Sequence, residues 1–157
     1  MRALSILHPC ITIPDLDEGI MFFRDLLGFE LAERGVHDPK QLGPLLAMED
    51  PDVPVAIVMC PDGTNIELLE FRRPRGELTV TRRFEDVGIS VVTVIVDDVT
   101  AVTERLAAHG YPAKGVIVPF AGPDRDLLAV HVLGPGGIPL TLGEWVPHVG
   151  QPTGETR

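Results

Sequence analysis

The chain has 157 residues, of which 45% are hydrophobic and 23% are charged, and its formal net charge is −10. This composition is typical of a globular protein, and the length suits one ordinary domain or two half-size modules. The negative charge argues against nucleic acid and anionic membranes as partners, and no apolar run reaches the roughly 20 residues that cross a bilayer. Cys10 and Cys60 have neither metal-type nor redox-type spacing, so we expect reduced thiols in a cytoplasmic protein.

In the first half of the chain we expect one helix among four strands. Asp15 can cap the helix, with Glu18 at the third helical position as in a capping box, and Gly28 can supply a left-handed stop. The apolar stripe of this helix is expected to be Leu16, Ile20, Phe23 and Leu27. The expected strands are residues 5–13, 29–34, 54–60 and 64–71.

A polar stretch, residues 35–53, separates the second and third of these strands. It contains three Asp-Pro or Gly-Pro breakers, so we expect a long loop with at most a short turn of helix near residues 41–46. Loops of this length inside a compact domain often cover or form a binding site.

The same order of elements repeats in the second half. Asp98 can cap a helix whose Val99, Val102 and Leu106 share one face and which Gly110 ends. The expected strands are residues 91–98, 114–119, 127–133 and 138–145. We therefore predict a first βαβββ module at 1–72, a linker at 73–87, a second βαβββ module at 88–146 and a disordered tail at 147–157.

The last hairpin of each module carries the clearest repeat. PDGTNIELLEF, residues 61–71, recurs as PGGIPLTLGEW, residues 135–145, with identical proline, glycine, leucine and glutamate positions. One exchange changes the chemistry, because Glu67 of the first copy becomes Thr141 in the second. The segment HPCITIPDL also aligns to VVTVIVDDV. Internal duplication of this kind predicts two similar structural units.

With these motifs in this order, the chain resembles the vicinal oxygen chelate superfamily, which contains glyoxalases, bleomycin resistance proteins and extradiol dioxygenases. The carrying motifs are HPCITIPDLDEGIMFFRDLLGFEL, PDGTNIELLEF, GISVVTVIVDDVTAVTERLAAHGY and GPGGIPLTLGEW, within residues 5–145. The resemblance implies an α+β fold in which two tandem βαβββ modules form a cup-shaped mixed sheet with helices on the outside. It also implies a homodimer and a small-molecule substrate or ligand.

In catalytic relatives, a histidine on the first strand and a glutamate on the last strand of each module hold one divalent metal ion. The ion stabilises an enediolate-like anion of the substrate. Carried over by position, the first module keeps His8 and Glu67, whereas the second has Val91 and Thr141. The resemblance therefore implies one weakly held divalent metal ion at His8 and Glu67, with a metal-free site as the alternative.

His131 is a further candidate, from the geometry of the second hairpin. If Pro135 to Gly137 form a three-residue loop, His131 lies opposite Thr141 on the same face, as Ile57 lies opposite Glu67. His131 could then be a second acid/base or a substitute metal ligand. The alternative is a histidine that is merely hydrogen-bonded at a sheet end, and an even-numbered loop would move it off this face.

The polar residues of the strands and loops differ in their expected roles. Glu67 stands between Ile66 and Leu68 in an otherwise apolar strand, which favours a functional carboxylate because burying an unpaired charge is costly. Glu70 and Glu144 have the opposite strand parity and are expected to be structural. We expect no functional role for His37, His109 or His148.

Two hypotheses about function follow. The first is a lyase or isomerase-type enzyme acting on a small oxygenated substrate, with Glu67 as general base, His8 as metal ligand or acid, and His131 as second acid/base. The second is a metal-free antibiotic-binding or other small-molecule-binding protein of the bleomycin-resistance kind. The intact His8–Glu67 pair and the low aromatic content of 5% favour the enzyme. A ring-cleaving dioxygenase is less expected, because its iron requires two histidines and one carboxylate.

Overall fold

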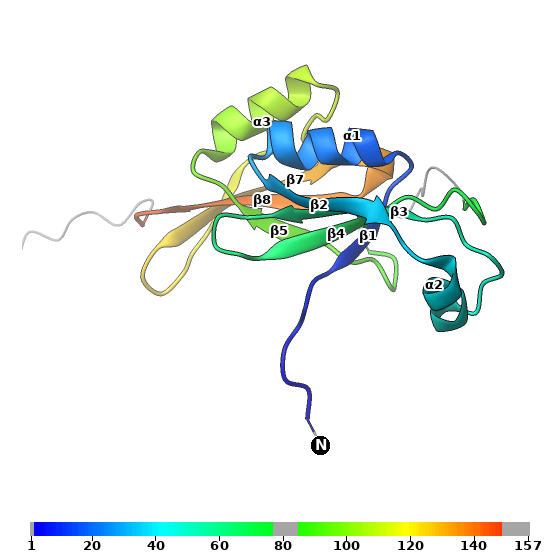
Figure 1. Cartoon of the computed structure of the whole chain (residues 1–157). Helices are drawn as coiled ribbons and strands as arrows, with labels where there is room; N and C mark the ends of the chain where they lie inside the picture. Colours follow the sequence, from blue (N-terminus) through cyan, green and yellow to red (C-terminus); the bar gives the residue numbers. More distant parts are fainter. Residues whose placement is uncertain (1, 77–84, 149–157) are drawn as a thin grey trace, which may run out of the picture. The chain divides into compact units, whose positions relative to one another are not determined.

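The computed structural model describes residues 2–76 and 85–148, which form two compact units (Figure 1). The first unit contains residues 2–76 with 135–137, and the second contains residues 85–134 with 138–148. The predicted linker and tail extend into residues 77–84 and 149–157, which lie outside the described residues. Within the described residues, no helix has both the length and the apolar character needed to cross a membrane.

Each unit contains a four-stranded mixed sheet. The strands of the first unit are β1 (Cys10–Thr12), β2 (Glu30–Val36), β3 (Pro54–Met59) and β4 (Asn65–Leu69), in the order β1-β4-β3-β2. The second unit has β5 (Val92–Ile95), β6 (Val118–Phe120), β7 (Asp126–Leu133) and β8 (Pro139–Val146), in the order β5-β8-β7-β6.

The helices are α1 (Leu16–Met21), the π-helical η1 (Phe22–Leu26) and α2 (Pro39–Leu46) in the first half of the chain, then α3 (Val99–Ala108) and the short η2 (Pro135–Gly137). In both sheets the first strand of the module pairs in parallel with the last, and the other pairs are antiparallel. The predicted α+β class with two tandem βαβββ modules is confirmed.

The two faces of the first sheet differ because side chains alternate along each strand. Buried and partly exposed residues alternate along β3 and β4. Helix α1 packs against β3 and β4, so the buried face, with Ile66 and Leu68 at 3% and 0% exposure, forms the core beneath it. Glu67 therefore points to the opposite face, as its parity predicts.

The first helix begins as predicted and ends differently. Asp15 caps it, because its Oδ1 accepts the Glu18 N–H at 2.8 Å, and Gly28 has the expected positive φ of 80°. The last turn widens into a π-helix, in which the Leu27 N–H bonds to the Phe22 carbonyl at 3.2 Å. This wider turn rotates the apolar stripe, so Leu26 at 3% exposure, rather than the predicted Leu27, is buried at its end.

Several predicted segments are wrong in extent. The strands expected at 91–98 and 114–119 are confined to Val92–Ile95 and Val118–Phe120. The strand expected at 5–13 is confined to Cys10–Thr12, and Leu4 and Ile6 before it are 87% and 90% exposed. The loop expected at 35–53 begins later and contains an eight-residue helix, Pro39–Leu46. Asp38 caps that helix by accepting the Lys40 N–H at 2.9 Å, so the Asp-Pro pair that suggested a break is a helix start.

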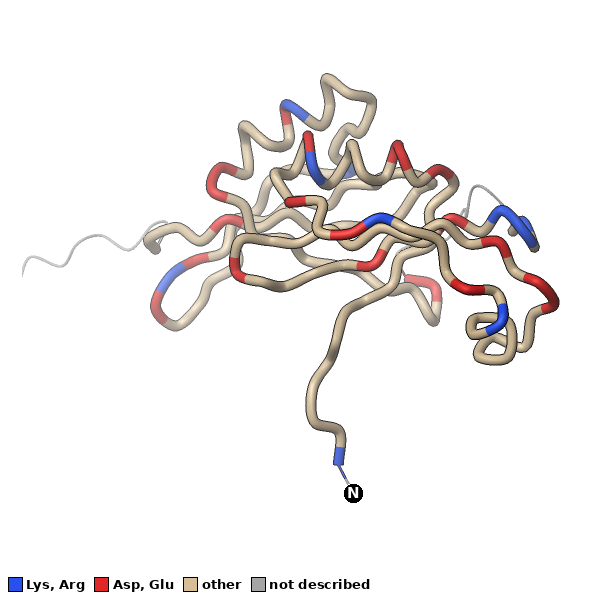
Figure 2. Tube along the Cα trace, viewed as in Figure 1, with Lys and Arg blue, Asp and Glu red and all other residues tan. Residues whose placement is uncertain are grey.

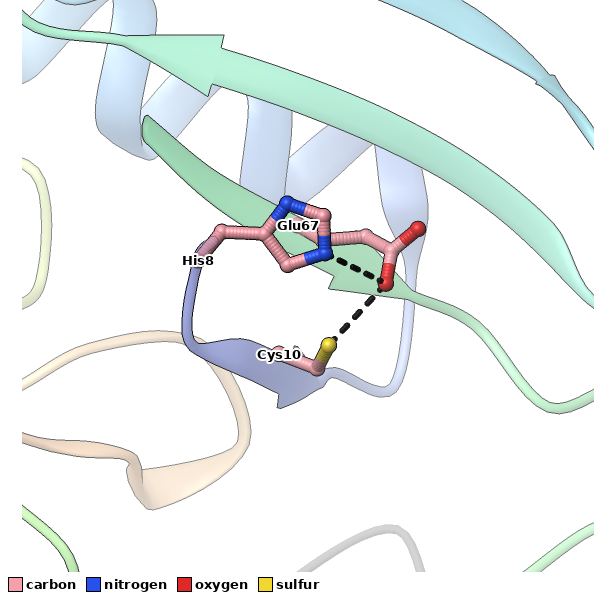
Figure 3. Close-up of side chains that lie close together, drawn as sticks. All are labelled: His8, Cys10 and Glu67. Carbon is pink, nitrogen blue, oxygen red and sulfur yellow. Dashed lines mark hydrogen bonds and ion pairs between the residues drawn. The ribbon is translucent and has the colours of Figure 1, made fainter. Parts of the chain in front are cut away.

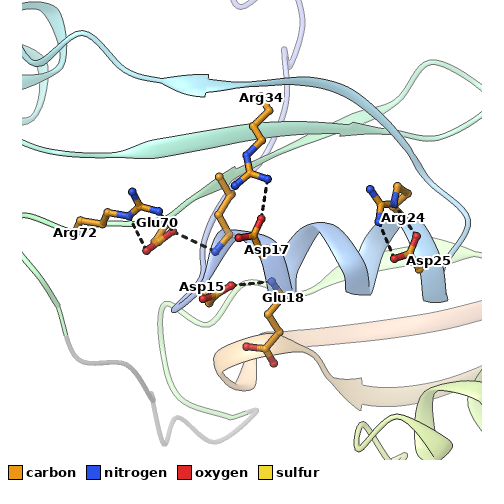
Figure 4. A network of polar contacts seen from close by, with 9 residues as sticks. Asp15, Asp17, Glu18, Arg24, Asp25, Arg34, Glu70 and Arg72 are labelled. Atoms are coloured by element: carbon orange, nitrogen blue, oxygen red, sulfur yellow. Dashed lines mark hydrogen bonds and ion pairs between the residues drawn. The ribbon is translucent and has the colours of Figure 1, made fainter.

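The repeated glutamates, Glu70 and Glu144, perform the same structural task in the two units. Glu70 Oε2 accepts the N–H of Leu16, the first residue of α1, at 3.3 Å (Figure 4). Glu144 Oε2 accepts the N–H of Val99, the first residue of α3, at 2.9 Å. A carboxylate at a helix N-terminus satisfies a free N–H and interacts favourably with the helix dipole. Their structural role explains why both copies of the hairpin keep this glutamate.

We expect Glu144→Ala to lower the free energy of unfolding by about 1 kcal/mol, because the first N–H of α3 loses its charged acceptor. Urea unfolding followed by circular dichroism measures the change. Glu104→Ala, at an exposed position on the same helix, is the matched control and should change stability by less than about 0.5 kcal/mol. Equal effects of the two substitutions would contradict the capping role.

Candidate functional site

A row of side chains crosses the first sheet on the face that points away from α1. Strand pairing places Cys10 beside Glu67, Glu67 beside Ile57 and Ile57 beside Glu33. The pairing of Ile57 with Glu67 is the one that the hairpin geometry predicts. Because paired residues project to the same face, three polar side chains from β1, β4 and β2 share this surface.

His8 and Cys10 approach one oxygen of the Glu67 carboxylate. Two residues apart in an extended segment, they project to the same side. The Cys10 thiol donates to Glu67 Oε2 at 3.0 Å, and His8 Nε2 lies 3.6 Å from the same oxygen (Figure 3). One ligand atom from each of the three residues lies within 4.8 Å of the other two. The structure thus brings together His8 and Glu67, and it adds Cys10.

His37 faces the other oxygen of the same carboxylate. It directly follows β2, where its backbone N–H donates to the Val53 carbonyl at 3.1 Å, and its Nε2 lies 3.2 Å from Glu67 Oε1. The sequence pattern does not predict a role for His37, because it places the end of the second strand at residue 34. Once the strand continues to Val36, position 37 has the same parity as Glu33, which could have indicated that it faces Glu67.

The side chains of His8, His37 and Glu67 border a cavity of about 320 Å³ in the first unit. Its lining residues are His8, Glu33, Gly35, Val36, His37, Val55, Ala56, Ile57 and Glu67. The volume lies at the lower end of the range for small-molecule sites, and the wall combines apolar side chains with convergent polar groups. The side chains of Glu67, His8 and His37 are 14%, 20% and 35% exposed, so they are partly sheltered from water and still accessible to a ligand.

The surroundings of Cys10, including the carboxylate of Glu67, disfavour ionisation of its thiol. Partial burial of the thiol, its hydrogen bond to Glu67 and the negative charge of that residue together raise the pKa of Cys10 to about 11. The thiol is therefore protonated at neutral pH, which is the form that donates to Glu67 Oε2.

Acidic residues are spread along the described chain (Figure 2). The groups that approach Glu67 are two imidazoles and a thiol. Nitrogen, sulfur and oxygen donors at such spacing are suitable ligands for a divalent ion such as Zn²⁺. His8, Cys10 and Glu67 are thus chemically able to hold the divalent metal that the fold suggests.

The second unit has the same strand register without the same donors. Thr93 pairs with Thr141 as Cys10 pairs with Glu67, and Val91 stands where the first unit has His8. His131 pairs with Thr141, which confirms the predicted hairpin geometry. Burial lowers the pKa of His131 below its ordinary value, against the opposing effect of a hydrogen bond with the Leu140 backbone. His131 belongs to the second unit, and the cluster around Glu67 belongs to the first.

Comparisons with known proteins identify the family of the chain. The family profile described as the Glyoxalase/Bleomycin resistance protein/Dioxygenase superfamily matches residues 5–140. A protein from Actinomyces sp. named 2-epi-5-epi-valiolone epimerase is 32% identical over 149 residues, covering 89% of this chain and 79% of that protein. The chain therefore belongs to the glyoxalase/bleomycin resistance/dioxygenase superfamily.

Solved structures show the same fold. A glyoxalase family protein from Bacillus cereus matches with a TM-score of 0.84 and 25% identity, covering 93% of this chain and 97% of that one. The trypanothione-dependent glyoxalase I of Leishmania major matches with a TM-score of 0.61 and 18% identity, covering 89% and 86% of the two chains. At this identity the second match supports the fold alone.

We expect Cys10 to react slowly with iodoacetamide, because at a pKa of about 11 only roughly one thiol in a thousand is ionised at pH 8. The rate, measured on metal-free Cys60→Ser protein so that Cys10 is the sole thiol, should rise steadily from pH 8 towards pH 11. Adding Glu67→Gln should speed the reaction at pH 8, because it removes the negative charge. A rate that levels off below pH 9 would contradict the raised pKa.

Proposed function

We propose that the chain is an isomerase-type enzyme that moves a proton on a small oxygenated substrate, with Glu67 as the general base. The observation that carries this proposal is a mostly buried carboxylate at the wall of a small cavity, with an imidazole facing each oxygen. A carboxylate in this setting is shielded from water and oriented by its neighbours, as a general base requires. The similarity to an epimerase supports the same reaction type.

That similarity and the size of the cavity support our proposal of a substrate class. The Actinomyces relative is named for 2-epi-5-epi-valiolone, and the ending of that name denotes a ketone. We propose for this chain a small hydroxylated ketone whose product differs at a carbon next to the carbonyl. A hydrogen on such a carbon can be removed as a proton, because the carbonyl oxygen accepts the resulting negative charge.

In the proposed reaction, Glu67 takes the proton from this carbon and the C–H electron pair becomes the C=C bond of an enolate. Return of a proton to the opposite face of the carbon inverts the stereocentre. His131, in the second unit, remains our sequence-based candidate for the second acid/base, and because burial lowers its pKa it would have to be protonated before it could return the proton. A divalent metal held by His8 and Glu67 would add positive charge near the carbonyl oxygen. If His8 and Glu67 were its only protein ligands, that ion would be weakly held, and metal-free acid/base chemistry is the alternative.

Within this proposal His37 positions the base. Its Nε2 lies 3.2 Å from Glu67 Oε1, while the Cys10 thiol and His8 face Oε2. Contacts on both oxygens restrict rotation of the carboxylate and hold it towards the cavity. Precise placement of a catalytic group can contribute several kcal/mol to lowering a barrier.

We expect Glu67→Gln to lower turnover by about 10²- to 10⁴-fold, because an amide cannot accept the proton. Epimerisation of 2-epi-5-epi-valiolone in D₂O, followed by NMR, measures both turnover and incorporation of deuterium at the reacting carbon. Glu30→Gln, on the exposed end of β2, is the control and should retain activity. Undiminished deuterium incorporation by Glu67→Gln would rule out Glu67 as the base. Saturable binding without turnover by the wild type would instead favour a binding protein.

We expect His37→Ala to lower kcat by roughly 10- to 100-fold with a smaller change in KM, because the base remains but loses its positioning partner. His109→Ala, at the C-terminal cap of α3 in the second unit, is the control and should leave both constants unchanged. A change confined to KM would indicate that His37 binds substrate instead of positioning Glu67.

The domain boundaries at 72, 88 and 146, the homodimer and the cytoplasmic location remain predictions. Superfamily membership supports a small-molecule substrate. The net charge of −10 supports the expectation that nucleic acid is not a partner.

A further inference from the structure

We propose that Cys10 is a third metal ligand, so that the first unit forms a His–Cys–Glu site without any contribution from the second. This inference deepens the proposed function, because it assigns a complete set of ligands to the metal that His8 and Glu67 would otherwise hold weakly. It also changes the kind of ion that the site selects.

The strand register places the thiol at the carboxylate. Cys10 pairs with Glu67 in the parallel ladder of β1 and β4, and His8 lies two residues earlier on the same side. Ligand atoms around a tetrahedral Zn²⁺ ion lie roughly 3.3–3.6 Å apart, as its bond lengths of about 2.0–2.3 Å require. The distances from Glu67 Oε2 are 3.0 Å to Cys10 Sγ and 3.6 Å to His8 Nε2. Both distances to Glu67 Oε2 are thus close to the spacing that one such ion needs, and the ligand atoms of Cys10 and His8 lie within 4.8 Å of each other.

His37 contacts the ligating carboxylate without being a metal ligand itself. Its Nε2 contacts Oε1, the carboxylate oxygen that His8 and Cys10 do not face. Groups that hold a ligating carboxylate in this way orient it and raise metal affinity. The two oxygens of Glu67 thus have separate partners, and Oε2 is the oxygen available for a metal.

Cys10 replaces donors that the second unit has lost. In that unit the equivalent positions are Val91, Thr93 and Thr141, which provide an alkyl group and two hydroxyls. Three ligands from one unit leave a fourth position open for an oxygen of the substrate, as in catalytic zinc sites. A thiolate makes the set softer, so we infer a preference for Zn²⁺ or Co²⁺ over Mg²⁺ or Ca²⁺.

Cobalt spectroscopy tests this inference without substrate. Metal-stripped full-length protein is titrated with Co²⁺, and a thiolate ligand gives a sulfur-to-cobalt charge-transfer band in the near ultraviolet. We expect the band in wild type, its loss in Cys10→Ser, and its retention in the matched control Cys60→Ser, which removes the other cysteine of the chain. In Cys10→Ser the affinity for Co²⁺ should also fall, by more than the roughly 10- to 100-fold that is lost when a residue that only hydrogen-bonds to a metal ligand is removed.

A second measurement covers the case in which Cys10→Ser does not fold. In wild-type protein, Zn²⁺ should protect Cys10 but not Cys60 from N-ethylmaleimide, as mass spectrometry of the peptides shows, and Mg²⁺ should protect neither. Equal protection of both cysteines, or none, overturns the inference. So does a sulfur band that is absent from wild type at saturating Co²⁺ or that persists in Cys10→Ser.

The experiments distinguish an error in the assignment of Cys10 as a metal ligand from an error in the proposed isomerase function. Wild type that binds Co²⁺ without the sulfur band, yet still epimerises the ketone, would remove Cys10 as a ligand and leave Glu67 as base. Wild type with the sulfur band but no proton exchange would support the metal site and overturn the isomerase proposal.

Discussion

The polar face of the first sheet is arranged around the carboxylate of Glu67, whose side chain is only 14% exposed. Removing a carboxylate from water is costly unless hydrogen bonds or opposite charges replace the lost hydration. The replacements are the Cys10 thiol and His8 at one oxygen and His37 at the other. His8 precedes β1, Cys10 begins it and His37 directly follows β2, so one side chain on β4 connects both edge strands of the sheet.

Alternation along the strands separates this polar chemistry from the core. Ile66 and Leu68 on either side of Glu67 are buried towards helix α1, and the intervening carboxylate points to the cavity. A hydrophobic core on one face and a polar cluster on the other can therefore coexist within a five-residue strand. A shift of one residue in the register would exchange the two faces, which explains why the hairpin geometry constrains the site so closely.

The duplication separates what the fold requires from what the chemistry requires. Both units keep a glutamate that caps the first N–H of a helix, Glu70 in one and Glu144 in the other, because each helix has free N–H groups at its start. Only the first unit keeps the donors at the row occupied by Cys10 and Glu67. Its counterpart in the second unit, Thr93 beside Thr141, retains the pairing but not the ligands.

The sequence by itself determined the two modules, the N-caps of α1 and α3, the side of the sheet on which Glu67 lies and the pairing of His131 with Thr141. These features are local or periodic, since they depend on alternation, capping and turn length. Only the tertiary structure placed Cys10 and His37 at Glu67. Cys10 reaches it through a parallel pairing across 57 residues, and His37 through two extra residues of β2. Neither the register of a parallel pair nor the exact end of a strand can be read from local pattern, because both depend on how distant segments pack.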